Sequence, residues 1–591
     1  MPDPSQTLVP LLQDAMAAAL GEEFRGADPI IRRSAQDKFG DYQANAAMSL
    51  AKATGRPPRE VAEAVVSRLR ADGVVARAEV AGPGFINLTL EDGFLGRQAS
   101  AAAGDPRLGV SEVGEPARFV LDYGGANVAK ELLVHHMRST VIGDAVARVL
   151  EYLGHVVIRQ DHWGDWGRQF GMLIEHLVDL GWEADSASER TISDLNVLYQ
   201  EAQTKFDAGG TFAERARRRV VQLQAGDPET MALWQALVDE SERHFQAVYR
   251  RLGLTIGPAD VRAESFYNPM LEPLARELEE KGLARVDQGA LCAFPEGFTG
   301  REGQPLPVIL RNSEGAYLYA ATDVAAVRYS TEDLKGERLV YFTDARQAQH
   351  FAMVFAVCRE AGWLGPESTA EHAPFGNVVG QDGRPFRTRS GDSVKLADLL
   401  DEAVARAWAV VVEKSPALGP DEQMAVAEAV GVGGLKYHDL ANDRIKDYVF
   451  DWDRMLAREG NTAPYLQYAH ARIRSILRRA ESAAAEDAAA AITASAVPPA
   501  VLVAEPQERA LALALLGFEA AVESVAEGMA PHRLCTYLFD LASTFTSFYE
   551  ACPVLRAEPE LRDSRLVLCR LTASVLSTGL GLLGIEAPER M

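Results

Sequence analysis

The sequence predicts a multidomain α/β protein in which a parallel-sheet domain lies between a small α+β domain and an all-helical C-terminal half. Three observations lead to this prediction. The chain has 591 residues, which is too many for one hydrophobic core. Residues 117–160 follow the order strand, glycine-rich turn, helix and strand, which is typical of a βαβ unit. After about residue 400 the apolar residues recur at helical spacing.

The composition is that of an ordinary globular protein, with 47% hydrophobic and 24% charged residues. The N-terminus has no basic leader, and no apolar run is long enough to span a bilayer, so we expect a cytoplasmic protein without membrane contact. The odd number of scattered cysteines predicts free thiols and gives no metal-ligand spacing. They are Cys292, Cys358, Cys535, Cys552 and Cys569.

The formal net charge of −24 argues against a general attraction to nucleic acid. A local basic patch is nevertheless enough to bind phosphates. Two groups of basic residues are candidates: residues 215–219, which are better explained as a solvated helix face, and a second group in the C-terminal half. The second group is His470, Arg472, Arg474, Arg478 and Arg479.

The βαβ unit has a recognisable start and end for each element. Residues 119–121 have strand character, and Gly124-Gly125 breaks the chain. Asn127 is suited to cap the helix that periodicity predicts over 128–153, and 156–158 form a second strand. The turn therefore lies at a helix N-terminus at the carboxyl edge of a parallel sheet, a place that suits a phosphate group.

Basic side chains cluster at this turn, namely Lys130, His135, His136 and Arg138. A solvated basic face is the alternative explanation. The second strand leads into a loop of polar, aromatic and glycine residues at the same edge, Asp161 to Gly167, and such loops more often serve binding sites than packing. We therefore favour a phosphate-binding site.

Two motifs in this unit resemble those of one family, the class I arginyl-tRNA synthetases. Residues 126–140, ANVAKELLVHHMRST, are similar to the family's N-x-A-K-x-x-H-x-G-H-x-R-S-T, and residues 164–171, GDWGRQFG, to its G-D-W-G-x-Q-F-G. The resemblance covers essentially the whole chain. It implies an N-terminal tRNA-binding domain (1–110), a Rossmann-like class I catalytic domain (115–400) with a helical insertion (about 185–255), a helical stem-contact region (401–455) and an all-α anticodon-binding domain (456–591).

The chain departs from the family pattern at two positions of the H-x-G-H motif. Leu133 stands at the first histidine, and His135 stands at the glycine. In the family the histidines contact ATP phosphates, and the glycine leaves room for the adenine. A leucine cannot donate a hydrogen bond, and an imidazole would crowd the base. Two hypotheses stay open: a working synthetase, or a paralogue that binds tRNA and arginine with lost or repurposed aminoacylation.

Residues 1–110 read as two helices, 8–19 and 59–71, and a strand pair, 75–80 and 84–90, followed by a linker over 101–115. The resemblance implies that this domain contacts the D-loop of tRNA through Phe85 and Asn87. An aromatic ring and an amide suit an unpaired base, but Phe85 is almost as well explained as a core residue.

Residues 256–360 return to the parallel sheet. Glu264 lies at a predicted strand end, and Asp323 lies near a helix start, where it could serve as an N-cap. Carboxylates, a hydroxyl and an amide suit a guanidinium. The resemblance implies an arginine site made of Asn127, Glu264, Tyr319, Asp323 and Gln347.

A turn at Asp382-Gly383 is followed by a basic loop that contains Arg384, Arg387 and Arg389. Such a loop could clamp a triphosphate. It resembles a degenerate form of the class I K-M-S-K-S loop, without its lysine. In the family the lysine before the H-x-G-H helix can compensate, and that residue is Lys130.

The C-terminal half is predicted to be helical over 401–414 and 421–430, loosely held over 481–505, and helical again in three further segments. Periodicity alone makes Tyr537, Tyr549 and Met591 core residues. The resemblance implies that they lie near the anticodon.

The implied activity is that of an arginine–tRNA ligase, which uses ATP with Mg²⁺ to activate L-arginine and transfers it to the 2′-OH of tRNA(Arg). We expect a monomer without a metal site of its own. The resemblance assigns catalysis to Lys130, His136, Arg387 and Arg389. It assigns ATP binding to Val134, His135, His136, Arg138, Gly164, Asp165, Gln169 and Arg384.

Overall fold

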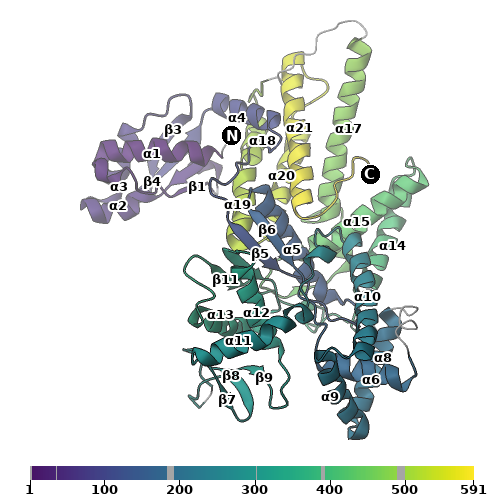
Figure 1. The fold of residues 1–591 in the computed structure, drawn as a ribbon. Coiled ribbons are helices and arrows are strands. Elements are labelled where there is room, and N and C mark those ends of the chain that lie inside the picture. Colours follow the sequence, from purple (N-terminus) through teal and green to yellow (C-terminus); the bar gives the residue numbers. More distant parts are fainter. Residues whose placement is uncertain (1–2, 35, 183–191, 301, 388–392, 489–499) are drawn as a thin grey trace.

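The computed structural model describes residues 3–34, 36–182, 192–300, 302–387, 393–488 and 500–591. The N-terminal domain lies to one side, the parallel sheet lies at the centre, and the C-terminal helices stand beside both (Figure 1). This arrangement confirms the predicted multidomain α/β fold.

The N-terminal domain is an antiparallel sheet with helices packed on it. The strand order is β1-β2-β4-β3, and the strands are β1 (Ile31–Arg33), β2 (Tyr42–Ala44), β3 (Val75–Ala81) and β4 (Phe85–Leu90). The helices are α1 (Pro4–Leu20), α2 (Ala46–Thr54) and α3 (Pro58–Arg68). The linker prediction over 101–115 was wrong at its start, because α4 (Asp92–Gly104) continues to Gly104.

The N-terminal domain packs against the C-terminal half through α18 (Pro506–Leu516). Leu513 and Leu516 of α18 belong to the N-terminal hydrophobic core. Arg509 donates two hydrogen bonds of 2.7 Å to Asp41 and one of 2.8 Å to Asp92. Apolar packing and a bidentate charged contact therefore join the two ends of the chain.

The central sheet is parallel, with the order β11-β10-β5-β6. Its strands are β5 (Arg118–Asp122), β6 (Val156–Gln160), β10 (Arg338–Tyr341) and β11 (Thr369–His372). α5 (Val134–Tyr152) connects β5 to β6, as predicted, and Gly154 follows its end with a φ of 92°. The predicted helix start was wrong, because residues 124–133 are not helical and Asn127 forms a β-bridge with Gly164 instead of a cap.

Helical and sheet insertions extend from this sheet. The α6 (Arg168–Asp179), α8 (Ile192–Asp207), α9 (Gly210–Gln224) and α10 (Pro228–Arg251) helices follow β6. After α11 (Asn268–Glu280) comes an antiparallel sheet that was not predicted, with strands β7 (Ala284–Asp287), β8 (Ala290–Ala293) and β9 (Val308–Arg311). The α12 (Tyr319–Glu332) and α13 (Ala348–Glu360) helices then flank β10.

In the part that the structure describes, the C-terminal half is helical apart from one short parallel strand pair, β12 (Val378–Val379) with β13 (Tyr448–Val449). Its helices are α14 (Leu396–Lys414), α15 (Pro420–Leu440), α16 (Trp452–Met455), α17 (Ala463–Ala488), α18, α19 (Phe518–Gly528), α20 (His532–Ala551) and α21 (Pro559–Leu582). α17 extends to Ala488, so the expected loose segment was wrong over 481–488, and its residues 489–499 lie outside the described part. Four helices follow, one more than predicted.

Within the described ranges, one helix, α21, is long and apolar enough to cross a membrane by length and composition, which the sequence does not predict. However, 72% of its apolar window is buried inside the fold, where α21 packs on α17, α18 and α20. Its apolarity is therefore explained by packing at the centre of the bundle. All five cysteines are free thiols, as predicted, and all five are buried.

Candidate active site

The candidate site lies at the carboxyl edge of the central sheet. β5 pairs in parallel with β6 on one side and with β10 on the other. The strands that follow β5 in the sequence are therefore added first to one side of it and then to the other. The loops after β5 and β10 separate at such a switch point and leave a crevice for ligands. Two cavities lie there, with volumes of about 680 Å³ and about 300 Å³.

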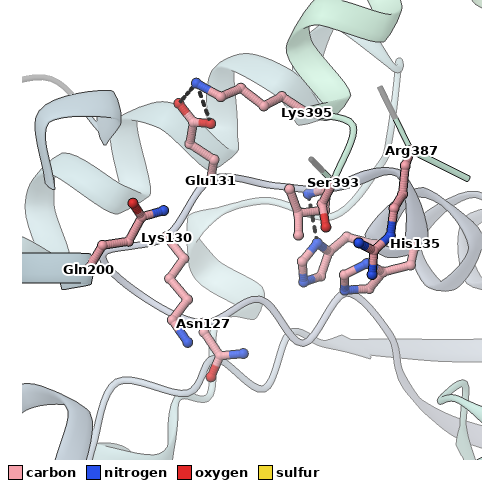
Figure 2. A pocket seen from close by; sticks show the side chains of 10 residues that line it. Asn127, Lys130, Glu131, His135, Gln200, Arg387, Ser393 and Lys395 are labelled. Atoms are coloured by element: carbon pink, nitrogen blue, oxygen red, sulfur yellow. Dashed lines mark hydrogen bonds and ion pairs between the residues drawn. The ribbon is translucent and has the colours of Figure 1, made fainter. Parts of the chain in front are cut away.

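The larger cavity, called cavity A below, collects basic side chains from the loop after β5, from α5 and from the basic loop (Figure 2). Its predicted members are Asn127, Lys130, His135, His136 and Arg387. Its other lining residues are Glu131, Leu133, Gln200, Ser393 and Lys395. With several cationic or imidazole groups around one concavity, cavity A is suited to a polyanion.

A backbone contact fixes the tautomer of His136, and burial keeps its ring neutral. The N–H of Leu133 donates to His136 Nδ1 over 2.9 Å, so the ring proton must lie on Nε2. Burial, and then the neighbouring His135, lower the pKa of His136 to about 3. The ring centroids of the two histidines are 4.0 Å apart. His136 is therefore a neutral donor through Nε2 at physiological pH.

The start of α5 is tied to the end of the basic loop. Leu133 forms a β-bridge with Lys395, and the N–H of Val134 donates to the carbonyl of Val394 over 3.0 Å. Lys395 Nζ also lies 2.7 Å from the buried carboxylate of Glu131 (Figure 2). These contacts fix the C-terminal anchor of the basic loop beside the histidines.

Lys130 precedes α5 and leaves the backbone at an unusual turn. Ala129 has a φ of +62°, a left-handed conformation that alanine rarely adopts, and its N–H donates to Ser241 Oγ of α10 over 2.9 Å. Lys130 Nζ lies 4.4 Å from the ring centroid of Tyr199 in α8. The insertion helices therefore set both the turn and the direction of the lysine.

Among the described residues, six that were predicted to bind ATP are absent from the lining of cavity A: Val134, Arg138, Arg384 and the three residues of the glycine motif, Gly164, Asp165 and Gln169. Val134 is the buried first residue of α5. Arg138 is fully buried, with Nε 3.1 Å from Asp439 and its guanidinium 5.0 Å from the ring of Tyr448. Arg384 is exposed beside the Asp382 turn. Arg389 lies outside the described residues.

The glycine motif after β6 supports both cavities. A Cβ at Gly164 would lie 2.6 Å from Asn127 Oδ1, so only glycine allows this close approach. Gln169 Nε2 donates to the Gly164 carbonyl over 3.2 Å and lines the smaller cavity. Asp165 is buried and accepts hydrogen bonds from Ser265 N at 2.9 Å and Ser265 Oγ at 2.5 Å. Asp165 therefore fixes the loop that carries Glu264.

The smaller cavity, called cavity B below, is lined by aromatic rings and one carboxylate. Glu264 and Tyr319 are its predicted members, together with Gln169. Its other lining residues are Trp166, Gly167, Met172, Tyr199, Leu271, Tyr317, Leu318 and Thr322. Glu264 lies in a 3-10 turn rather than at the predicted strand end.

Asp323 and Gln347, two further residues predicted for this site, are absent from the lining of cavity B. The possible N-cap role of Asp323 was wrong, because α12 begins at Tyr319 and places the carboxylate in its second turn. His350 Nε2 lies 2.6 Å from Asp323 Oδ2, and the Tyr319 ring packs on His350 with centroids 5.0 Å apart. Gln347 is exposed in the 3-10 turn before α13.

The carboxylates near cavity B repel each other. Burial, and then the charges of Asp165 and Asp323, raise the pKa of Glu264 to about 8. Burial with the charges of Asp161 and Asp323 raises the pKa of Asp122, at the end of β5, well above its usual value. A cationic ligand would relieve this repulsion, so cavity B is suited to a cation beside the polyanion site.

Family models match three consecutive parts of the chain. The class I synthetase (R) catalytic domain matches residues 102–452, the arginyl tRNA synthetase N-terminal domain matches 6–90, and the DALR anticodon binding domain matches 466–591. The arginine–tRNA ligase of Thermobifida fusca is 51% identical over 592 residues and covers 100% of both chains. The chain belongs to the class I arginyl-tRNA synthetase family.

Solved arginyl-tRNA synthetases have the same fold over the same length. The Plasmodium falciparum enzyme matches with a TM-score of 0.83 at 27% identity and covers 100% of both chains. The Thermus thermophilus enzyme matches with a TM-score of 0.77 at 28% identity and covers 98% of this chain and 99% of its own. The arginine–tRNA ligase of Frankia casuarinae is 49% identical over 99% of both chains.

Three of the residues expected to contact tRNA in this synthetase lie in the N-terminal domain and on α20. Phe85 is half-buried at the start of β4, and Asn87 is buried, with Oδ1 accepting from Gln43 Nε2 over 2.8 Å. Tyr537 donates to the Ala514 carbonyl over 3.0 Å and stacks on Phe518. A role for these three side chains in tRNA binding therefore requires them to act from partly buried positions.

Tyr549 and Met591 lie farther along the helical bundle of the synthetase. Tyr549 is half-buried on α20, and the guanidinium of Arg472 lies 4.8 Å from its ring centroid. Met591 packs against the core between α14 and α15. Two other basic residues of α17 are already paired, because Arg474 and Arg478 both approach Glu589 of the C-terminal tail. Arg472 with Tyr549 is thus the most open aromatic and basic pair of this group.

Sequence reasoning missed the contribution of α8 to the synthetase site. The insertion was assigned no chemistry, yet Tyr199 lines cavity B and Gln200 lines cavity A. A helical periodicity shows which face is apolar but not what that face meets. Lys395 and Glu131 were missed as well, although their places in the sequence could have indicated them. Lys395 lies at the end of the basic loop, and Glu131 is the neighbour of Lys130.

Proposed function

We propose that the chain is an arginine–tRNA ligase that assembles arginyl-adenylate across cavities A and B. The observation that carries this proposal is a basic cavity beside an acidic one at the switch point of a parallel sheet. In the first step the carboxylate of arginine attacks the α-phosphate of ATP and releases pyrophosphate. In the second step the 2′-OH of the terminal ribose of tRNA(Arg) attacks the adenylate and releases AMP.

In the proposed complex, cavity B holds the guanidinium of arginine. Glu264 and Asp323 supply negative charge, Tyr319 supplies a hydroxyl, and Gln347 reaches the site from the edge of α13. A guanidinium is always charged and presents planar donors that suit carboxylates. Asn127 lines cavity A and is bridged to Gly164, and from there it would orient the backbone of the amino acid.

Cavity A is proposed to hold the triphosphate, with Mg²⁺ arriving on ATP as part of the substrate. Lys130, Arg387 and Arg389 supply positive charge, and neutral His136 donates through Nε2. Val134, His135, Gly164, Asp165, Gln169 and Arg384 complete the proposed ATP site. Catalysis then consists of positioning and charge stabilisation, without a covalent bond between the enzyme and the substrate. Arg138 supports the site indirectly, by fixing α5 to Asp439.

We further propose a cytoplasmic monomer that binds tRNA(Arg) through Phe85, Asn87, Tyr537, Tyr549 and Met591, without membrane contact. Buried free thiols suit a reducing compartment. Light scattering of the purified chain is expected to give a mass near 64.1 kDa. A mass near twice this value would contradict the monomer.

The decisive experiment is arginine-dependent pyrophosphate exchange, with and without tRNA(Arg), beside charging of the same tRNA. Exchange and charging together are expected. The second candidate function is a paralogue that binds tRNA and arginine without normal aminoacylation, and it is favoured by one observation, the pair Leu133 and His135 at cavity A. Sound tRNA binding with neither reaction would favour this second function.

Restoring the family motif tests what these two residues do. The double variant Leu133→His with His135→Gly is expected to raise kcat/KM for ATP at least about tenfold, which corresponds to ~1.4 kcal/mol of barrier. Leu133 offers only its backbone N–H, which His136 already uses, and the His135 ring occupies space in cavity A.

The single variants separate the two causes. If crowding dominates, His135→Gly alone gives most of the gain, and if the missing donor dominates, Leu133→His does. An unchanged or lower rate in the double variant would mean that the cavity has adapted around the natural pair, and it would contradict the prediction.

A further inference from the structure

We propose that Tyr199, on insertion helix α8, is a positioning residue that holds the ammonium group of Lys130 at the boundary between cavities A and B. Tyr199 lines cavity B and contacts Lys130, which lines cavity A, while the next residue, Gln200, also lines cavity A. Neighbouring side chains on a helix point in different directions, so one turn of α8 faces both cavities. This inference rests on the proposed function.

The contact between Tyr199 and Lys130 has a specific chemical consequence. Lys130 Nζ lies 4.4 Å from the ring centroid, well within the range of a cation–π interaction. Among the described residues, no carboxylate lies within ion-pair distance of Lys130. A carboxylate would neutralise the ammonium group, and ATP would have to compete with it. An aromatic ring instead holds the ammonium group in place and leaves its charge available to a phosphate.

The position of Tyr199 is itself fixed by packing. Its ring packs on a small core that joins α6, α8 and α9, and the core residues are Met172, Ala202, Phe206, Phe212, Ala213 and Ala216. α6 begins directly after Gly167, the last residue of the glycine loop that supports both cavities. The ring is therefore anchored to the same loop that fixes Asn127 and Glu264.

Lys130 is held from both ends by the insertion. Its backbone follows Ala129, whose positive φ is stabilised by Ser241 of α10, and its ammonium group rests on Tyr199 of α8. A lysine side chain loses conformational freedom when it is fixed in this way, and the loss is complete before ATP binds. The insertion thus pre-organises the charge at the point where the carboxylate of arginine and the α-phosphate must meet.

The test is a double-mutant cycle between Tyr199 and Lys130, read by kcat/KM for ATP in pyrophosphate exchange and by the Kd for ATP from calorimetry. Tyr199→Leu is expected to lower kcat/KM about fivefold, and Tyr199→Phe, which keeps the ring, is expected to stay within about twofold. In the Lys130→Met background, Tyr199→Leu is expected to have no further effect.

The matched control is Phe206→Leu, which removes a ring from the same helix and the same small core without touching Lys130. It is expected to keep kcat/KM within about twofold. If Tyr199→Leu retains its effect in the Lys130→Met background, or if Phe206→Leu reproduces it, the role of Tyr199 is structural and the proposal fails.

The failure of the proposed function would be seen separately. Wild-type protein without exchange or charging would contradict the ligase assignment. The cycle in Kd for ATP would still decide whether Tyr199 acts through Lys130, because ATP binding does not need turnover. Additive losses of ATP affinity would overturn the positioning role, and non-additive losses would support it.

Discussion

Replacing Asp323 by alanine is expected to lower the affinity for arginine by about 30- to 5,000-fold and to leave tRNA binding unchanged. The carboxylate lies in the second turn of α12, half-buried, and its charge raises the pKa of Glu264, which lines cavity B. Truncating one partner of a buried charge pair costs about 2–5 kcal/mol, which corresponds to this range. Calorimetry measures the Kd for arginine, and filter binding measures the Kd for tRNA.

Two further variants separate the charge of Asp323 from its other contacts. Asp323→Asn keeps a polar group beside His350 and removes the charge, so a loss close to that of alanine is expected. Glu332→Ala lies on the same helix, where Glu332 pairs with Arg328, and is expected to leave arginine affinity within about twofold. An unchanged Kd for arginine in Asp323→Ala would remove Asp323 from the proposed site.

The pattern of the sequence was sufficient for the βαβ unit but not for the start of its helix. Apolar runs and glycines located β5, the end of α5 and β6, because these signals are local. The helix start depends on distant partners: Asn127 pairs with Gly164, and Ala129 is held by Ser241 of α10. Asparagine is a favoured N-cap residue, but at Asn127 long-range contacts prevail over this local preference.

The roles of single polar residues were harder to predict than the position of the site. Arg138 follows the phosphate-site candidates His135 and His136 in sequence, yet its guanidinium is buried against Asp439, which is 301 residues away in the chain. Glu264 was assigned to the wrong local structure and Asp323 to a possible N-cap that it does not form, but the two lie close enough for the charge of Asp323 to raise the pKa of Glu264. Residue type and spacing predict which chemistry is available, whereas the fold decides which cavity receives it.

The unexpected α8 contribution has the same cause. A helix in an insertion reveals its apolar face by periodicity, and Tyr199 follows that face because it packs on Met172 and Phe206. The contact between its ring and Lys130 joins α8 to the loop before α5, and no sequence pattern relates these two segments. Only the folded arrangement brings an ordinary core tyrosine beside a functional lysine.

Arginine affinity is expected to rise with pH up to about 8 and to level off above it. In the free protein the pKa of Glu264 is raised to about 8, first by burial and then by Asp165 and Asp323. A guanidinium requires the ionised carboxylate, so below this pKa each bound arginine must expel a proton. The Kd is therefore expected to fall about tenfold per pH unit between pH 6 and 7.5.

The released proton can be measured directly. Calorimetry at pH 7 in buffers with different ionisation enthalpies is expected to show release of close to one proton per arginine, and little release at pH 9. Glu264→Gln is expected to weaken binding and to remove this pH dependence. A Kd that is constant from pH 6 to 8 in the unmodified protein would mean that Glu264 is already ionised before arginine binds.

The same shift has a consequence for stability, with the opposite sign. An acid whose pKa is raised from 4.5 to about 8 on folding holds its proton more tightly in the folded state, so the free energy of unfolding falls as pH rises through this window. Bound arginine offsets this loss of stability, because its positive charge stabilises the ionised form of Glu264. The stabilisation of the protein by arginine in thermal unfolding is therefore expected to grow from pH 6 to pH 8. Such a result would mean that cavity B selects its cation with a carboxylate that is costly to ionise in the absence of the ligand.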